Sequence, residues 1–402
     1  MTTTTTEPPE APPPEPPSPM ESAAGVGDSL ARSLLVPALA VVAALVIGAL
    51  IIALTDVTLV PQLFSDLGPT LAAMGREVLS AYRALFRGAV GSVYAISETL
   101  FATTPLLLAS LGVALGFRAG LFNIGAQGQM LIGGMLAALL GIYLDLPGPI
   151  HIIVCILGGI VGGVVWGGIA GLLKARTGAH EVITTIMFNF VAIYLAQWLL
   201  TIPLFQEAGR NNPVSKPLQP SAVLSPLFGS TYRVTIGFLI AVAMVFVVHW
   251  LLFRSSFGFE FRAIGLNPEA GAYAGMGVVS SVVLAMGLAG GLAGMAGATQ
   301  LMSLAPFKAT VALPGSVGFD AITVALLGRS HPVGVLWASL LFGALKAGGR
   351  EMQGAAQIPL DLVTVLQALI VIFIAAPALV KAIFRLRGEA ERPAQLSKGW
   401  GS

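Results

Sequence analysis

The sequence predicts an all-α, polytopic integral membrane protein with about ten transmembrane helices, or nine if one short span does not cross. Of the 402 residues, 56% are hydrophobic and only 10% are charged, whereas soluble domains carry about 25% charged residues. Apolar stretches of about 20 residues, the length that a bilayer requires, recur along the chain. The 48 glycines fall largely within these stretches, as expected where helices pack closely in lipid.

The chain begins with a tail rich in threonine and proline over residues 1–30. Such a composition buries too little apolar surface to fold, so a disordered cytoplasmic tail is expected. A transmembrane domain is predicted over 31–382, and a basic cytoplasmic tail over 383–402. With the N-terminus in the cytoplasm, twelve of the 21 lysines and arginines fall on the cytoplasmic side. Both termini are therefore expected to be cytoplasmic.

The predicted spans follow one another from residue 34 to residue 380. They cover about 34–54, 98–117, 123–144, 150–173, 181–202, 234–253, 277–301, 316–328, 332–348 and 359–380. The eighth is short, which is typical of a half-helix or a re-entrant segment. After the first span, Arg76, Arg83 and Arg87 share one helical face and predict an amphipathic helix at the interface. A polar loop with five prolines occupies 203–233.

Polar residues within or beside the spans are the candidates for lining a substrate path. The stretch Arg118–Gly134 combines amides with glycines and predicts a broken helix around a cavity, or alternatively a short loop with a helix start at Asn123. Asn189 and Gln197 are eight residues apart and are expected to share a face. Asp320 is the clearest ionisable residue near membrane depth. The candidates are Phe122, Asn123, Gln127, Gln129, Asn189, Gln197 and Asp320; the alternative for each is a helix–helix hydrogen bond or a cap.

A cytoplasmic loop over about 254–276 contains the start of a helix. Asn267 can cap it, Pro268 suits its first position and Glu269 its first turn, so a helix is expected over about 268–275. A helix this short is marginal alone and needs a docking surface, on the same chain or on a partner. The chain has no Gly-Lys-Ser/Thr phosphate-binding loop. If ATP drives this protein, a separate subunit must hydrolyse it.

Composition excludes several other classes of function. The net charge of +2 is too small to indicate nucleic acid as a partner. Cys155 is the single cysteine and the four histidines lack ligand spacing, so neither a metal site nor a cofactor is expected. An intramembrane enzyme would need paired carboxylates or a serine–histidine arrangement within the spans, and none is evident. No catalytic residue is therefore predicted.

Five stretches, taken together and in order, resemble one family. They are RAGLFNIGAQGQ (118–129), GAHEVITTIMFNF (178–190), FGFEFRAIGLNPEAGAYAGM (257–276), GFDAITVALLGRSHPVG (318–334) and IPLDLVTVLQALI (358–370). The chain resembles the permease subunits of ABC importers of the branched-chain amino acid and ribose type, in the nucleoside (purine/uridine) branch associated with basic membrane lipoproteins. The family usually has Glu where Gln127 stands and Asn where His180 stands.

The resemblance implies a permease subunit in the cell membrane that transports a nucleoside. An ATP-binding subunit would dock on the coupling helix at Gly265, Leu266, Asn267, Pro268, Glu269 and Ala270. A second permease, identical or different, would complete the path, and an extracytoplasmic substrate-binding lipoprotein would deliver the small-molecule substrate to loops 203–233 and 302–315. The alternatives are a permease for simple sugars such as ribose, or an ion-driven secondary transporter, for which Asp320 is the chief buried carboxylate.

Overall fold

The structure, a computed structural model, describes residues 39–55, 60–207, 209, 211–376, 379–380 and 383–384. The chain divides into two compact units, Gly48–Val371 and a second unit made of Met1–Ile47 with Ile372–Ser402. The predicted tails lie outside the described residues, except for residues 383–384. Apart from two isolated bridges, the regular secondary structure of the described chain is helical, which confirms the all-α class.

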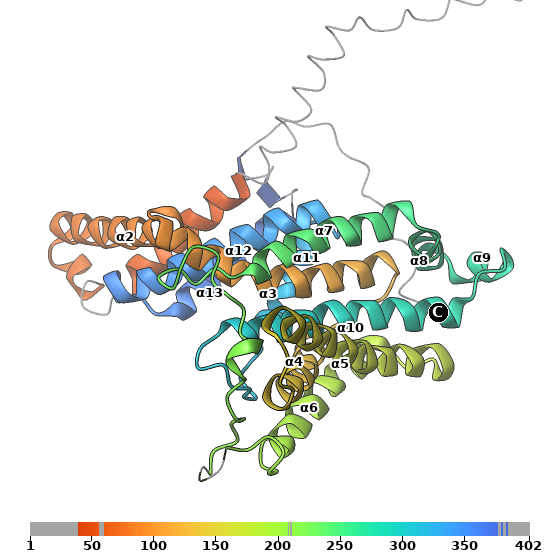
Figure 1. Ribbon diagram of the computed structural model, residues 1–402. Helices are drawn as coiled ribbons and strands as arrows, with labels where there is room; N and C mark the ends of the chain where they lie inside the picture. The colour runs from red at the N-terminus through yellow and green to blue at the C-terminus, as the bar shows by residue number, and fades with distance from the viewer. Residues whose placement is uncertain are drawn as a thin grey trace, which may run out of the picture. The chain divides into compact units, whose positions relative to one another are not determined.

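Seven described helices are long and apolar enough to cross a bilayer (Figure 1). They are α3 (Val93–Arg118), α4 (Ala126–Tyr143), α5 (Gly148–Thr177), α6 (Glu181–Leu199), α7 (Ile236–Arg254), α10 (Val278–Ser303) and α12 (Pro332–Ala356). Three shorter helices, Leu39–Thr55, α11 (Val317–Leu327) and α13 (Leu360–Ala375), fall in the predicted first, eighth and tenth spans. The count of about ten is therefore not confirmed. The 11 residues of α11 rise only about 16 Å, roughly half of the hydrocarbon thickness.

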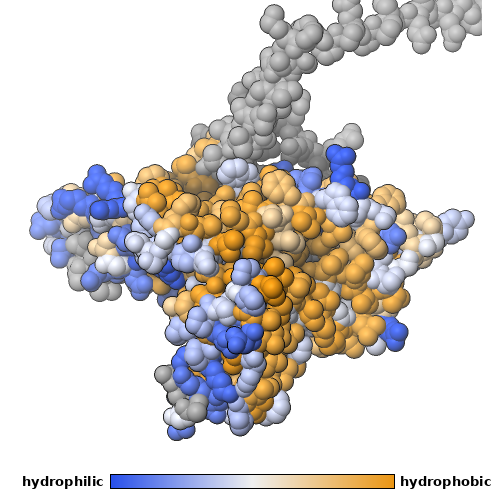
Figure 2. Space-filling model, viewed as in Figure 1, coloured by the Kyte–Doolittle hydropathy of each residue, from blue (hydrophilic) through white to orange (hydrophobic). Residues whose placement is uncertain are grey.

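Helices α4, α5 and α10 pack through glycine-bearing faces. A Cβ added at Gly163 of α5 would overlap the carbonyl oxygen of Gly290 in α10, and one at Gly297 of α10 would overlap that of Met130 in α4. The outer face of α5 is instead exposed and apolar, for example at Leu157. Figure 2 shows a broad hydrophobic surface over these helices. A lipid-facing exterior and a glycine-rich interior are the arrangement expected in a bilayer.

The amphipathic helix is present as α2 (Leu67–Val90), preceded by the short η1 (Pro61–Phe64). Its three arginines, Arg76, Arg83 and Arg87, are exposed, whereas its buried face packs against α3 and α12. α3 itself is buried along most of its length and lies beside α10 and α12. It starts earlier than the predicted residue 98 because the Ser92 side chain accepts a hydrogen bond from Ala95 N–H and caps it.

The loop between α7 and α10 holds two helices rather than the single one expected. α9 (Pro268–Tyr273) corresponds to the predicted helix, and α8 (Ser256–Leu266) precedes it. The Ser255 hydroxyl caps α8 by accepting a hydrogen bond from Gly258 N–H. Both helices lie at the end of the unit where α7 finishes and α10 begins (Figure 1).

The long polar loop after α6, which includes η2 (Pro220–Ala222), folds onto the segment that follows α10. The backbone N–H groups of Ser215, Leu218 and Leu224 donate to the carbonyl groups of Ala309, Phe307 and Met302, at 3.0 Å in each case. Lys308 and Glu207 form an ion pair of 2.8 Å between the two segments. The two predicted outer loops therefore form one ordered surface.

Candidate functional site

Between α3 and α4, two helices each long enough to cross a bilayer, the chain is non-helical over residues 119–125. This connection, called the break below, corresponds to the alternative of a short loop, although α4 starts at Ala126 rather than at Asn123. Asn123 is fully buried; its Oδ1 accepts from Gly125 N–H at 2.9 Å and its Nδ2 donates to Gln129 Oε1 at 3.0 Å. Asn189 of α6 donates to the Ile124 carbonyl at 2.9 Å and accepts from Gly128 N–H at 2.8 Å. The structure thus brings together three candidate path residues, Asn123, Gln129 and Asn189. Asn123 and Asn189 satisfy backbone groups of the break, whereas Gln129 binds the Asn123 side chain. A place in the substrate path stays a prediction for all three.

The other candidates on α4 and α6 have different surroundings. Gln127 donates from Nε2 to the Gly315 carbonyl at 2.6 Å and accepts at Oε1 from Gly318 N–H at 3.0 Å, so it holds the start of α11. The Phe122 ring is partly buried, 4.9 Å from that of Phe117.

Asn189 and Gln197, which were expected to share one helical face, have different surroundings. Asn189 is buried and Gln197 is exposed. Eight residues turn the helix by about 80° beyond two full turns, which is enough to separate them.

A cavity of about 400 Å³ lies among α3, α10, α12 and the approach to α11. This volume falls within the usual range of small-molecule sites, about 300–1,000 Å³. The lining combines apolar side chains with hydroxyl, amide and cationic groups; the polar and aromatic members include Phe101, Thr104, Arg233, Thr235, Gln300, Ser303, Ser316, Lys346 and Arg350. Of the predicted residues, Gln127 and Asp320 bind groups in this wall.

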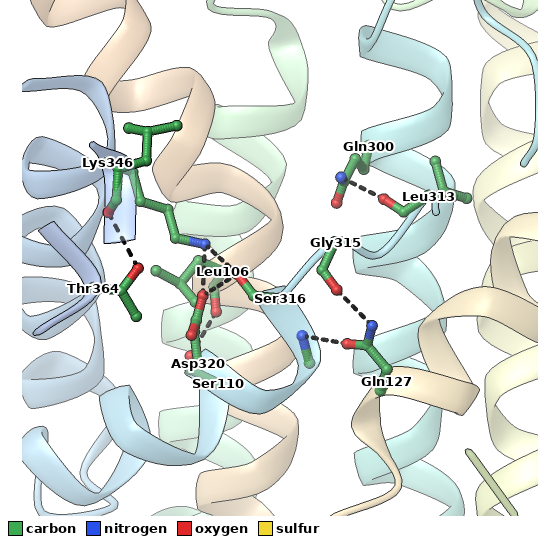
Figure 3. Close-up of polar contacts among 12 residues, drawn as sticks. Leu106, Ser110, Gln127, Gln300, Leu313, Gly315, Ser316, Asp320, Lys346 and Thr364 are labelled. Atoms are coloured by element: carbon green, nitrogen blue, oxygen red, sulfur yellow. Dashed lines mark hydrogen bonds and ion pairs between the residues drawn. The ribbon is translucent and has the colours of Figure 1, made fainter. Parts of the chain in front are cut away.

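The ion pair between Lys346 and Asp320 forms one side of the wall (Figure 3). The Lys346 ammonium lies 2.6 Å from Asp320 Oδ2, which also accepts a hydrogen bond from the Ser316 hydroxyl at 2.7 Å. Across the segment from Leu313 to Ser316, Gln300 donates to the Leu313 carbonyl at 2.6 Å. Lys346 was not predicted, although it is a charged residue within the predicted ninth span and the rule that identified Asp320 applies to it equally.

A second ionic group borders the cavity. Glu98 of α3 receives Arg233 Nη1 at 2.9 Å and Arg350 Nη1 at 3.0 Å on one carboxylate oxygen, and its side chain is 12% exposed. Arg233 also covers the Phe101 ring, 4.2 Å from its centroid. Among the described residues, Glu98 Oε1 and Gln300 Oε1 are buried acceptors without a hydrogen-bond partner. The wall therefore combines cationic donors with amide, carboxylate and hydroxyl groups that can accept. It suits a ligand with hydroxyl, carbonyl or ring-nitrogen groups.

The predicted coupling residues divide into two sets. Asn267 caps α9, since its Oδ1 accepts from Glu269 N–H at 3.0 Å and Ala270 N–H at 3.1 Å. Leu266, Asn267, Pro268, Glu269 and Ala270 are exposed, Leu266 to 85%.

Gly265 instead packs on the break between α3 and α4. A Cβ added to Gly265 would lie 2.7 Å from Gly120 N.

Comparison with known protein families identifies the family to which this chain belongs. Residues 95–375 match the family described as branched-chain amino acid transport system / permease component. The chain belongs to this permease family. The permease is accordingly a multi-pass protein of the cell membrane, and the resemblance of its five stretches is confirmed.

Individual relatives cover most of the permease. The guanosine ABC transporter permease protein NupP of Bacillus subtilis is 34% identical, over 79% of this chain and 93% of its own length. The glucose ABC transporter permease protein TsgB13 of Haloferax volcanii is 34% identical, over 76% and 83%. The nucleoside ABC transporter permease protein NupB of Lactococcus lactis is 32% identical, over 78% and 88%. No solved structure matches the chain.

Proposed function

We propose that this permease forms part of the path of an ATP-driven importer of nucleosides, and that the cavity beside Lys346 receives the substrate. The polar wall of the cavity, with both donors and acceptors, is the observation that carries the proposal, because the sugar hydroxyls of a nucleoside donate and accept and its base adds further donors and acceptors. Relatives named for guanosine and for nucleosides support this substrate class. The relative named for glucose, another polyhydroxy compound, supports simple sugars as the second candidate.

The orientation proposed from charge places the cavity toward the outside. Lys346 and Arg350 lie in the second half of α12, and Arg233 lies in the polar loop just before α7. A separate substrate-binding lipoprotein would dock on the surface formed by the loop after α6 and the segment after α10. The coupling helices α8 and α9 would then face the cytoplasm, with both termini on that side.

A separate ATP-binding subunit would dock on the exposed residues of α9 and move the permease through packed contacts. Gly265 of α8 presses on Gly120 in the break, and the break leads into α4. Gln127 of α4 holds Gly315 and Gly318 at the start of α11. This continuous set of contacts links the docking surface to the cavity wall. The permease itself would perform no covalent chemistry, and a second permease subunit, identical or different, would complete the path.

Uptake by the reconstituted importer tests the proposal. Replacing Lys346→Met together with Asp320→Asn removes a donor without leaving an unpaired charge. We expect KM for the transported nucleoside to rise about tenfold, the loss of one charge-assisted hydrogen bond. Lys174→Met together with Glu181→Gln removes another ion pair, between the end of α5 and the start of α6 and outside the cavity lining; it is the matched control and should leave KM unchanged. An unchanged KM in the double variant would exclude the cavity as the substrate site.

Competition assays separate the substrate classes and the energy source. Labelled guanosine uptake should be inhibited by unlabelled nucleosides more than by glucose or ribose; the reverse order assigns the permease to sugars. Uptake should also persist when an ionophore collapses ion gradients at constant ATP. Its collapse under these conditions would indicate an ion-driven carrier.

A further inference from the structure

Four basic side chains surround one aromatic ring at the end of α7. The Phe253 ring lies 5.7 Å from the Arg118 guanidinium and 5.4 Å from that of Arg262, measured to the ring centroid. The rings of His249 and His331 lie 5.1 and 5.3 Å from it, and 5.4 Å from each other. We call these five residues the Phe253 cluster. They come from α3, α7, α8 and the residue that precedes α12.

The positive charge of the Phe253 cluster is not balanced within the described chain. Neither arginine nor either histidine forms an ion pair with a described carboxylate, whereas Lys346, Arg233 and Lys308 each do. The nearby Glu260 of α8 accepts from the Ser281 hydroxyl instead.

Both histidines of the cluster are partly buried and lie beside other basic groups. Burial, together with the charges of His249 and Arg118, lowers the pKa of His331 below its ordinary value. Nδ1 of His249 is buried and has no hydrogen-bond partner in the described structure. Buried polar groups normally have one.

Both arginines of the cluster have guanidinium nitrogens to which no described residue is hydrogen-bonded. Arg262 uses Nε for the Gly258 carbonyl at 3.2 Å, and within the described chain its two terminal nitrogens have no partner. Arg118 binds the carbonyls of Ser330 and Arg329 through Nε and Nη2, and its Nη1 has no described partner. Guanidinium groups bind phosphate oxygens in pairs, with charge-assisted bonds.

The surroundings of the Phe253 cluster favour a lipid as the source of a phosphate ligand. Trp250, next to His249 in sequence, is 60% exposed, and Phe257 and Phe259 of α8 are exposed as well. Exposed tryptophan and basic residues at a helix end mark the boundary between membrane and water. We propose that the Phe253 cluster binds the phosphate of an anionic phospholipid headgroup, beside the coupling helices. Basic pockets between helices bind such headgroups in other membrane proteins.

Lipid binding by the purified full-length permease tests this proposal independently of transport. The protein is placed in nanodiscs of phosphatidylcholine with increasing phosphatidylglycerol. Its unfolding temperature is measured, and native mass spectrometry identifies the lipids that it retains. We expect phosphatidylglycerol to be retained and to raise the unfolding temperature. Arg262→Gln should weaken this effect about tenfold, by loss of charge-assisted bonds. Arg254→Gln is the matched control, because Arg254 is exposed at the same end of α7 and outside the cluster.

Each alternative has its own outcome. Equal retention of the two lipids, or an equal loss in both variants, would overturn the proposal. Stabilisation by inorganic phosphate without any by phosphatidylglycerol would assign the cluster to a soluble anion and overturn the lipid source. A further outcome is that Arg262→Gln leaves lipid affinity unchanged and weakens binding of the ATP-binding subunit. That result would assign the Phe253 cluster to acidic side chains of that partner, and would also overturn the lipid proposal. If Arg262→Gln does not fold, His331→Gln provides the same comparison.

Discussion

At the scale of single residues, the amide of Gln127 is matched to the two backbone groups it meets. Its Nε2 donates to the Gly315 carbonyl and its Oε1 accepts from Gly318 N–H. An ionised carboxylate can only accept. A glutamate here would keep the bond to Gly318 but lose the one to Gly315. An amide therefore suits this position better than the glutamate expected from the resemblance.

Variants of Gln127 should therefore lose stability in a fixed order. We expect the unfolding temperature to fall from wild type to Gln127→Glu and further to Gln127→Leu, because each net hydrogen bond contributes about 1 kcal/mol. Thermal unfolding in detergent followed by tryptophan fluorescence measures this order. Gln197→Leu, at an exposed position, controls for the change of side chain. A Gln127→Leu variant as stable as wild type would show that the clamp on α11 contributes nothing.

Because Lys346 and Asp320 form an ion pair, the effect of replacing one on folded yield should depend on whether the other is also replaced. Asp320→Asn alone leaves the Lys346 charge without its carboxylate, and Lys346→Met alone leaves that of Asp320. Each should lower the yield of folded protein, while the double variant should recover most of it. The coupling free energy expected for contacting residues is about 0.5–3 kcal/mol. Size-exclusion profiles of membrane extracts measure the folded yield. Losses that simply add in the double variant would rule out a stabilising pair.

At the scale of helices, the contact between α5 and α10 depends on backbone approach. A Cβ at Gly163 would overlap the Gly290 carbonyl, whereas one at Gly168 on the same helix would meet nothing within 4 Å. Gly163→Ala should destabilise the permease by about 1–3 kcal/mol, the usual cost of overpacking. Gly168→Ala should be neutral or stabilising by up to about 1 kcal/mol, because alanine favours a helix. Equal unfolding temperatures for the two variants would contradict this packing.

Helices were predictable wherever apolar length and caps define them locally. The cap at Asn267 and the short eighth span were read correctly, since both depend on neighbouring residues alone. α8 was missed because its polar and aromatic residues resemble an ordinary loop. Glu98 and the two arginines that bind it were missed for a different reason. Glu98 meets Arg350 only when α3 packs beside α12, and no local pattern specifies that pairing.

At the scale of the whole molecule, the two functional regions are joined through the break at 119–125. The amides that the sequence indicated there hold the break rigid, because Asn123 and Asn189 satisfy its backbone groups. A rigid connection can pass movement from α8 to α4 and on to α11. Docking of the partner and transmission of its movement should therefore be separable, since exposed residues serve the first and buried contacts the second.

Two variants of the coupling region test that separation in the assembled importer. Gly265→Val places a branched side chain against Gly120 and leaves the exposed residues of α9 unchanged. The ATP-binding subunit should therefore still co-purify and hydrolyse ATP, whereas nucleoside uptake should fall about tenfold or more. Glu269→Lys reverses a charge on the exposed surface and should weaken co-purification itself. The assays are pull-down, ATPase rate and nucleoside uptake on the same preparations. If Gly265→Val retained normal uptake per ATP hydrolysed, the contact between Gly265 and Gly120 would not transmit the movement.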